Sequence, residues 1–220
     1  MMNLSDTNSM GLLIATKNPG KARETKEFLK ESVSWRIELI SLADLKDAPD
    51  IEETGKTFEE NVVLKAKAYF EWSGIPAVAD DAGLEIDYLN SEPGVLSRRW
   101  PSFAEASKGK PGREKTDQEL IDMALEKLKG LSKEKRTAHL VAVGAYYDGK
   151  NTIIERGSID GYIVEKQTAE CEPGYPFRSI FMVPKFHKLY QDLSHEEHEQ
   201  INHHKMVYNK LAKRIWDLLA

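Results

Sequence analysis

Two pairs of adjacent carboxylates are the residues best suited to chemistry: Glu52-Glu53, followed by a Thr-Gly step, and Asp80-Asp81. Carboxylate oxygens are hard ligands that suit Mg²⁺, with phosphates and water completing an octahedron. Asp80-Asp81 follows an apolar segment that begins at Pro76, so we expect it to end a strand, where a charge needs a cation or water. A polar strand end beside an acidic loop is the alternative.

Residues 16–21 (TKNPGK) combine hydrogen-bonding and basic side chains after the apolar segment 11–16 (GLLIAT). The apolar segment predicts a strand, and Asn18-Pro19 predicts the start of a helix that continues to about Glu31. Backbone N–H groups at a helix start favour an anion. The segment is therefore a candidate phosphate cradle, with hydrogen bonds and charge from Thr16, Lys17, Asn18 and Lys21. A solvated turn with ordinary capping is the alternative.

A second helix is predicted from the capping box formed by Thr57 and Glu60. Asn61 and Lys65 are four residues apart in it and therefore share one face. A lysine there can reach a phosphate or orient an acid, whereas an ordinary surface lysine is the alternative.

Ser194 and Glu197 form another capping box, which predicts one helix continuing to Leu219. Four histidines lie in this region, and their spacing allows a metal site or simply a polar helix face. No cysteine or carboxylate pattern accompanies them as in a standard zinc site. Near neutral pH they can also meet anionic phosphates. The four are His195, His198, His203 and His204.

The remaining segments favour an α/β fold with a mixed sheet, because a hairpin lies beside strand–helix–strand units. We expect strands at 84–89, 137–147 and 152–156, a helix at 117–128, and a loop at 108–116. Asp148-Gly149 predicts the hairpin turn. Residues 1–10 are expected to be an N-terminal extension, and residues 11–220 one domain.

Composition narrows the class of protein. The 220 residues are 40% hydrophobic and 30% charged, with a formal net charge of −5. An acidic chain is a poor binder of nucleic-acid polymers, and no apolar segment reaches the length of a membrane span. Cys171 is the only cysteine, so no intrachain disulfide can form. We expect a cytoplasmic protein.

Three segments, taken in order, resemble the Ham1/inosine triphosphate pyrophosphatase family. They are 14–24 (IATKNPGKARE), 52–68 (EETGKTFEENVVLKAKA) and 76–100 (PAVADDAGLEIDYLNSEPGVLSRRW). The resemblance runs from about Leu12 to Leu211. It implies an elongated α/β fold of two lobes, with a central mixed sheet flanked by helices and a nucleotide cleft between the lobes. It also implies a homodimer.

The same resemblance implies an enzyme that removes noncanonical purine nucleotides from the nucleotide pool. Inosine, deoxyinosine or xanthosine triphosphate would be hydrolysed to the monophosphate and pyrophosphate with Mg²⁺. Asp81 would be the general base or the metal-bound activator of water, with Asp80 beside it and Lys65 on a phosphate. Asp81 and either Glu52 or Glu53 would bind the metal. The triphosphate would be held by Thr16, Asn18 and Lys21, with Lys17 and Asn61 nearby.

The sequence departs from the family pattern at the end that would recognise the base. Ala82 replaces a serine and loses a hydroxyl contact. Arg178 replaces an aspartate in a segment where Tyr175 and Phe177 keep aromatic rings for stacking on a base.

In the C-terminal motif His203 keeps its place. His198 replaces a phosphate-facing lysine, and His204 replaces an arginine expected to read a purine carbonyl. We therefore hypothesise a shifted base preference. Alternatives are a pyrophosphatase for another modified or standard base, a catalytically weak nucleotide-binding protein, and a zinc-binding interaction module.

Overall fold

The computed structural model describes residues 10–32, 37–102, 105, 107 and 112–219. The strands are β1 (Met10–Ile14), β2 (Ile37–Ser41), β3 (Ala77–Ile86), β4 (Glu92–Pro93), β5 (Thr137–Tyr147), β6 (Thr152–Ile163), β7 (Phe181–Val183) and β8 (Lys188–Leu189). The helices are α1 (Pro19–Ser32), α2 (Phe58–Ser73), α4 (Asp117–Lys127), α5 (His195–Glu199) and α6 (His203–Leu219).

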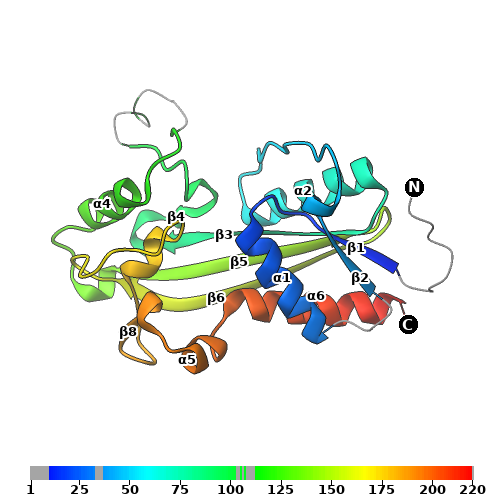
Figure 1. The fold of residues 1–220 in the computed structure, drawn as a ribbon. Helices are drawn as coiled ribbons and strands as arrows, with labels where there is room; N and C mark the ends of the chain where they lie inside the picture. The colour runs from blue at the N-terminus through cyan, green and yellow to red at the C-terminus, as the bar shows by residue number, and fades with distance from the viewer. Residues whose placement is uncertain (1–9, 33–36, 103–104, 106, 108–111, 220) are drawn as a thin grey trace. The chain divides into compact units, whose positions relative to one another are not determined.

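The strands described form one mixed sheet in the order β2-β1-β3-β5-β6-β7-β8, with β4 against β3 (Figure 1). β1 is parallel to both β2 and β3, whereas the pairs β3–β4, β6–β7 and β7–β8 are antiparallel. The α/β class with a mixed sheet is therefore confirmed.

The chain forms two compact units. Unit 1 comprises the described residues of Met1–Asp81, Val143–Gly157 and His204–Ala220, and unit 2 those of Ala82–Ala142 and Ser158–His203. Strands β3, β5 and β6 contribute residues to both units.

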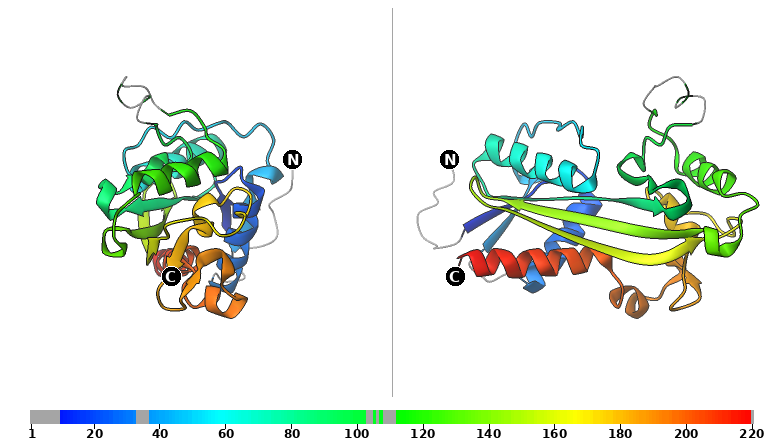
Figure 2. Two further views of the ribbon diagram at one scale, coloured as in Figure 1. Left: turned by 90° about the vertical axis from the view of Figure 1, so that its left-hand side faces the viewer. Right: turned by 180° about the vertical axis from the view of Figure 1, so that it is seen from behind.

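Unit 1 packs helices on both faces of its strands. α2 lies on one face, and α1 and α6 lie on the other (Figure 2). α6 approaches β5 closely, because a Cβ at Gly144 would lie 2.7 Å from Leu211 and 2.8 Å from Val207. α1 and α6 also meet, with the rings of Phe28 and Tyr208 6.3 Å apart.

Unit 2 has its own apolar core, in which α4 packs against the parts of β3, β5 and β6 that belong to this unit. A buried arginine links separate segments of the chain at the edge of this core. Arg136 is 3% exposed and donates to the carbonyls of Leu128 and Ile163, each at 2.7 Å, and to that of Val164. One side chain thus fixes the end of α4 to the end of β6.

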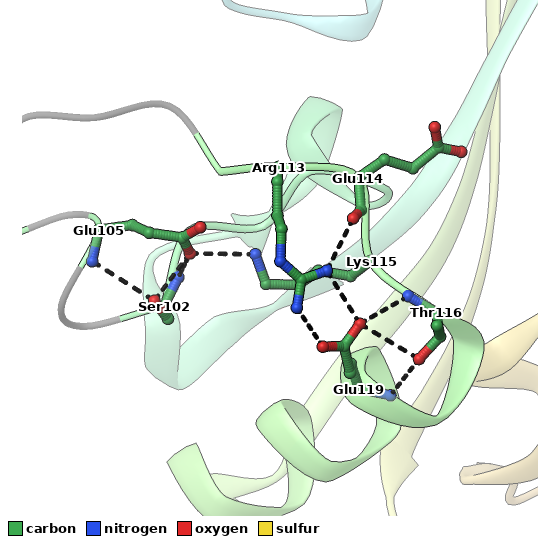
Figure 3. Close-up of polar contacts among 7 residues, drawn as sticks. All are labelled: Ser102, Glu105, Arg113, Glu114, Lys115, Thr116 and Glu119. Carbon is green, nitrogen blue, oxygen red and sulfur yellow. Dashed lines mark hydrogen bonds and ion pairs between the residues drawn. The ribbon is translucent and has the colours of Figure 1, made fainter.

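A network of polar contacts fixes the entrance to α4 (Figure 3). Glu105 accepts from Ser102 and from the buried ammonium of Lys115, 3.1 Å away. Hydrogen bonds from Ser102, and then from Lys115, lower the pKa of Glu105 to about 2. Thr116 caps the helix in a capping box with Glu119.

Several predicted elements are confirmed by the structure. Helices form where caps predicted them, at Asn18, Thr57 and Ser194. The 148–151 turn joins β5 to β6, with the Asp148 carboxylate accepting from the backbone of Lys150 and Asn151. The predicted helix at 117–128 and strand at 137–147 correspond to α4 and β5.

Other predictions were wrong in their bounds. The two strands expected at 76–80 and 84–89 are one continuous strand, β3, so Asp80-Asp81 lies inside a strand and does not end one. The C-terminal helix is broken at residues 200–202 into α5 and α6. Met10, expected in an N-terminal extension, begins β1, while residues 1–9 and 108–111 lie outside the described residues.

Arg136→Met should destabilise unit 2, because it leaves three buried carbonyl acceptors without their donor. We expect the free energy of unfolding to fall by about 3 kcal/mol. Urea denaturation followed by circular dichroism measures the change. Lys135→Met, which removes an exposed cation from the neighbouring position, is the matched control. Equal stability of the two variants would contradict the structural role of Arg136.

Candidate functional site

Residues 16–21 form a capped helix start at the end of β1. The amide oxygen of Asn18 accepts from the backbone N–H groups of Gly20 at 2.9 Å and Lys21 at 3.2 Å. Asn18 itself donates through its backbone to Thr16 Oγ1 at 3.3 Å. Lys17 is exposed and pairs with Asp50 at 2.5 Å. The capping geometry is therefore present, and of the two lysines only Lys21 belongs to the buried cluster described next.

Asp80 and Asp81 lie in β3 immediately beyond its pairing with β1. The paired residues are Leu13 with Ala77 and Ile14 with Val78, and Ala15 donates to the Val78 carbonyl at 2.8 Å. Both carboxylates therefore lie beside the carboxyl end of β1, next to the turn into α1, while β3 continues to Ile86. In open α/β sheets this edge is the usual place for a ligand.

Asp80 is 5% exposed and its carboxylate is held by cations. Its Oδ2 accepts from Lys21 Nζ at 3.0 Å. Burial alone would raise the pKa of Asp80, but Lys21, followed by His204 and Lys65, lowers that pKa to about 2. In turn, burial would lower the pKa of Lys21, but Asp80 and Asp81 raise it well above its ordinary range.

Asp81 has a different environment. The side-chain amide of Asn61 donates to its Oδ2 at 3.4 Å. Burial is the main cause that raises the pKa of Asp81, and the negative charges of Glu53 and Asp80 add to it, against Lys65 and Lys21. A carboxylate with a raised pKa is better suited to accept a proton near neutral pH.

Lys65 connects this pair to the acidic loop. Its Nζ donates to the backbone carbonyl of Asp80 at 2.6 Å and pairs with Glu53 at 3.0 Å. Glu53 is half-buried, whereas its neighbour Glu52 is exposed. Asn61, one turn before Lys65, also accepts from the backbone of Gly55 at 2.8 Å and so fixes the loop to α2. The i,i+4 spacing thus places both side chains at the site.

The resulting carboxylate–lysine cluster, defined as Lys21, Glu53, Lys65, Asp80 and Asp81, lies within unit 1. It has three carboxylates against two ammonium groups. At Asp81, burial together with the charges of Glu53 and Asp80 outweighs the two lysines, so its pKa is raised. Oxygen donors with an excess of negative charge fit a hard divalent cation such as Mg²⁺, which typically uses one or two carboxylates together with substrate phosphates.

A second cluster lies within unit 2, around Arg178. The guanidinium lies 3.7 Å from the ring centre of Tyr175 and 5.3 Å from that of Tyr190, and it pairs with Glu172 at 3.0 Å. His198 Nε2 lies 2.5 Å from the Tyr190 hydroxyl. Burial, followed by the charge of Arg178, lowers the pKa of His198. We call these five residues the arginine–aromatic cluster.

The other predicted recognition residues are placed as follows. Phe177 is 7% exposed and belongs to the apolar core of unit 2. His203 is buried, with its ring edge-on to Tyr190 at 6.1 Å. Ala82 lies in β3. His204, in unit 1, is close enough to the carboxylate of Asp80 to lower its pKa.

The described part of the chain has no preformed metal site made of side chains alone. No group of three or more histidine, cysteine, aspartate or glutamate side chains there is arranged to hold a metal ion, and the four C-terminal histidines lie in this part of the chain. Likewise, none of the described helices combines the length and apolarity that crossing a membrane requires.

Sequence reasoning missed four residues. Glu172 and Tyr190 belong to the arginine–aromatic cluster, whereas Thr25 and Tyr208 lie beside the carboxylate–lysine cluster. Tyr208 lies on α6, and its hydroxyl bonds Thr25 at 2.9 Å and also the Asp80 carboxylate. A tyrosine in an otherwise apolar stripe was the available signal, because a buried hydroxyl needs a partner. Glu172 and Tyr190 carried no comparable signal.

Comparison with known proteins defines the class. A model of the Ham1 family matches residues 12–214, and the chain belongs to this family. The dITP/XTP pyrophosphatase of Bacillus subtilis (strain 168) is 37% identical over 202 residues, covering 91% of this chain and 94% of that protein. The dITP/XTP pyrophosphatase of Geobacillus kaustophilus is 38% identical over 207 residues, covering 94% of each.

A solved structure agrees with the fold. The Staphylococcus aureus Ham1 protein superimposes with a TM-score of 0.78 at 32% sequence identity, covering 94% of this chain and 98% of that one. The α/β architecture is therefore that of a Ham1 protein.

Asp80 and Asp81 should affect stability with opposite sign. The pKa of Asp80 is lowered from 3.8 to about 2. Its ionised form therefore stabilises the fold fully above about pH 4, and this contribution is lost as the pH falls toward 2. The pKa of Asp81 is raised. Its ionised form therefore destabilises the fold at pH 7, and this effect disappears as the pH falls through the folded pKa.

In EDTA at pH 7, we expect Asp80→Asn to lower the free energy of unfolding by about 3 kcal/mol, because it leaves Lys21 without its buried partner. Asp81→Asn should raise the free energy of unfolding. Denaturant titration measures both, with the exposed Asp122→Asn as control. A loss of stability in Asp81→Asn equal to that in Asp80→Asn would contradict the two pKa shifts.

Proposed function

We propose that this protein hydrolyses noncanonical purine nucleoside triphosphates, of the inosine or xanthosine type, to the monophosphate and pyrophosphate. The observation that carries the proposal is the carboxylate–lysine cluster beside the start of α1, in a member of the Ham1 family. Its relatives are named dITP/XTP pyrophosphatases, so the enzyme class is a nucleoside-triphosphate pyrophosphatase. A homodimer in the cytoplasm is part of the same proposal, on the family resemblance.

We assign Mg²⁺ as the metal, held by Asp81 and Glu53. Glu53 is preferred over Glu52 because it is half-buried and pairs with Lys65, whereas Glu52 is exposed. When bound, the ion would offset phosphate charge and polarise a phosphoryl oxygen.

The remaining steps belong to side chains. Lys21 and Lys65 bind the triphosphate through their ammonium groups, beside the start of α1. The attacking water adds to the α-phosphorus and gives its proton to Asp81. The anhydride bond between the α- and β-phosphates then breaks. The pyrophosphate leaves with the electron pair of that bond. Asp81 lies beside Asn61, whose side-chain amide donates to its Oδ2 at 3.4 Å, and a positioned carboxylate can take the proton of the attacking water.

We also propose a base preference shifted from that of the family. Arg178 is stacked on Tyr175 and its charge is balanced by Glu172. Guanidinium N–H groups bind acceptor pairs such as O6 and N7 of an oxopurine. Arg178 therefore either reads a base carbonyl or replaces the positive charge that the sequence lacks at His204. These two roles predict different behaviour of paired variants.

The function is tested by pyrophosphate release with Mg²⁺ from a panel of nucleoside triphosphates. The panel holds the triphosphates of inosine, deoxyinosine and xanthosine, the standard triphosphates, and triphosphates of several damaged bases. We expect turnover of at least one purine nucleoside triphosphate outside the standard set. Asp81→Asn should then reduce kcat by about 10²–10⁴-fold, because it keeps the shape but deletes the proton acceptor.

Asp122→Asn, on the exposed face of α4, is the matched control and should retain full activity. Full activity of Asp81→Asn would remove Asp81 from the mechanism. No turnover of any triphosphate by the unaltered protein, together with tight nucleotide binding, would favour a nucleotide-binding protein.

Base reading is tested with Arg178→Met, His204→Arg and the double variant. If Arg178 reads the base, kcat/KM for the preferred substrate falls about tenfold in Arg178→Met, and adding His204→Arg does not restore it. If Arg178 only replaces charge, the double variant recovers activity.

Arg214→Met removes an exposed arginine of α6 and serves as the control for charge. An inosine and xanthosine preference that is the same in all variants, with the standard triphosphates untouched, would refute the shifted preference.

A further inference from the structure

Tyr208 is a buried tyrosine whose hydroxyl points to a functional role for the C-terminal helix. It lies on α6, is 2% exposed, and packs its ring against Phe28 of α1. An apolar residue would fill the same space. The hydroxyl therefore needs a reason beyond packing, because burying it is unfavourable unless it is hydrogen-bonded.

The hydroxyl has two partners, and their chemistry fixes the direction of both hydrogen bonds. Thr25 lies 2.9 Å away, and the Asp80 carboxylate is the second partner. An ionised carboxylate can only accept, so the single O–H of Tyr208 donates to Asp80. Tyr208 therefore accepts from Thr25. All three side chains are at most 5% exposed, so water does not compete freely for these bonds.

Asp80 is the common anchor of both lysines of the cluster. Its carboxylate accepts from Lys21 at 3.0 Å, and its backbone carbonyl accepts from Lys65 at 2.6 Å. The rotamer of the Asp80 side chain sets the position of the Lys21 ammonium. Tyr208 binds the same carboxylate from α6 and so helps to hold this rotamer, beside His204 of the same helix, whose charge also acts on Asp80.

We propose that Tyr208 is a positioning residue that acts through Asp80 to hold Lys21 where a substrate phosphate binds. The inference rests on the proposed function, in which Lys21 contacts the triphosphate. It assigns Asp80 to the support of Lys21 and leaves proton transfer to Asp81. Thr25 orients the Tyr208 hydroxyl from the other side.

The test compares Tyr208→Phe, which removes only the hydroxyl, with Thr25→Val, which removes the donor to it. The control is Tyr147→Phe, which deletes a tyrosine hydroxyl in the β5–β6 turn region that bonds Gly149. The probe is inorganic triphosphate, bound in EDTA and measured by calorimetry, so that neither metal nor base contributes. Steady-state kinetics with Mg²⁺ give KM and kcat.

Tyr208→Phe should weaken triphosphate binding about threefold to tenfold and raise KM by a similar factor, with kcat within about twofold. Thr25→Val should show a smaller effect, because Tyr208 keeps its bond to Asp80. In a Lys21→Met background, Tyr208→Phe should cause no further loss. If Tyr208 were only structural, Tyr208→Phe would lower the stability of the protein, and its effect on triphosphate binding would not depend on Lys21.

Unchanged triphosphate affinity in Tyr208→Phe, or the same fold-loss with and without Lys21, would overturn the inference. Failure of the proposed function is distinguishable from this outcome. A protein that hydrolyses no nucleotide but shows the coupled binding losses keeps the positioning role, whereas an active enzyme without them loses only that role.

Discussion

Asp80 and Asp81 are neighbours in one strand, and a strand directs successive side chains to opposite faces of its sheet. Each carboxylate must therefore be satisfied by a different layer of unit 1. Lys21 of α1 and Tyr208 of α6 bind Asp80 on one side. α2 approaches Asp81 on the other through Asn61. Because an uncompensated buried charge costs several kcal/mol, all three helices are constrained by the needs of two residues, and the difference between their pKa values follows from the difference between the two layers.

Local signals in the sequence predicted the parts of this arrangement that depend on neighbours in the chain. The caps at Asn18 and Thr57 fixed two helix starts, and the spacing of Asn61 and Lys65 placed both on one face. The continuity of β3 could not be predicted, because aspartate, alanine and glycine at 80–83 are poor strand formers that tertiary pairing overrides. The bond between Thr25 and Tyr208 joins residues 183 positions apart, and no local pattern reports such a contact.

Unit 2 shows how a reversed charge is accommodated. Arg178 stands where the family pattern has an aspartate, and a lone arginine there would be a partly buried cation. Glu172 supplies the counter-charge, while Tyr175 and Tyr190 supply ring faces that favour a guanidinium. The sequence revealed the substitution at Arg178 but not its compensation, because Glu172 is exposed and lies outside the motifs that carry the resemblance. The arginine–aromatic cluster is therefore a balanced set of side chains.

The register between β1 and β3 has a consequence for the roles of the two acids. Ile14 pairs with Val78, and this pairing decides which carboxylate meets Lys21. A shift of one residue reverses the face of every side chain in a strand. Such a shift of β3 would keep every side chain of the site yet present Asp80 to α2 and Asp81 to α1. The buried residues of β3, which fix its register, thus specify which acid supports a lysine and which is left to accept a proton.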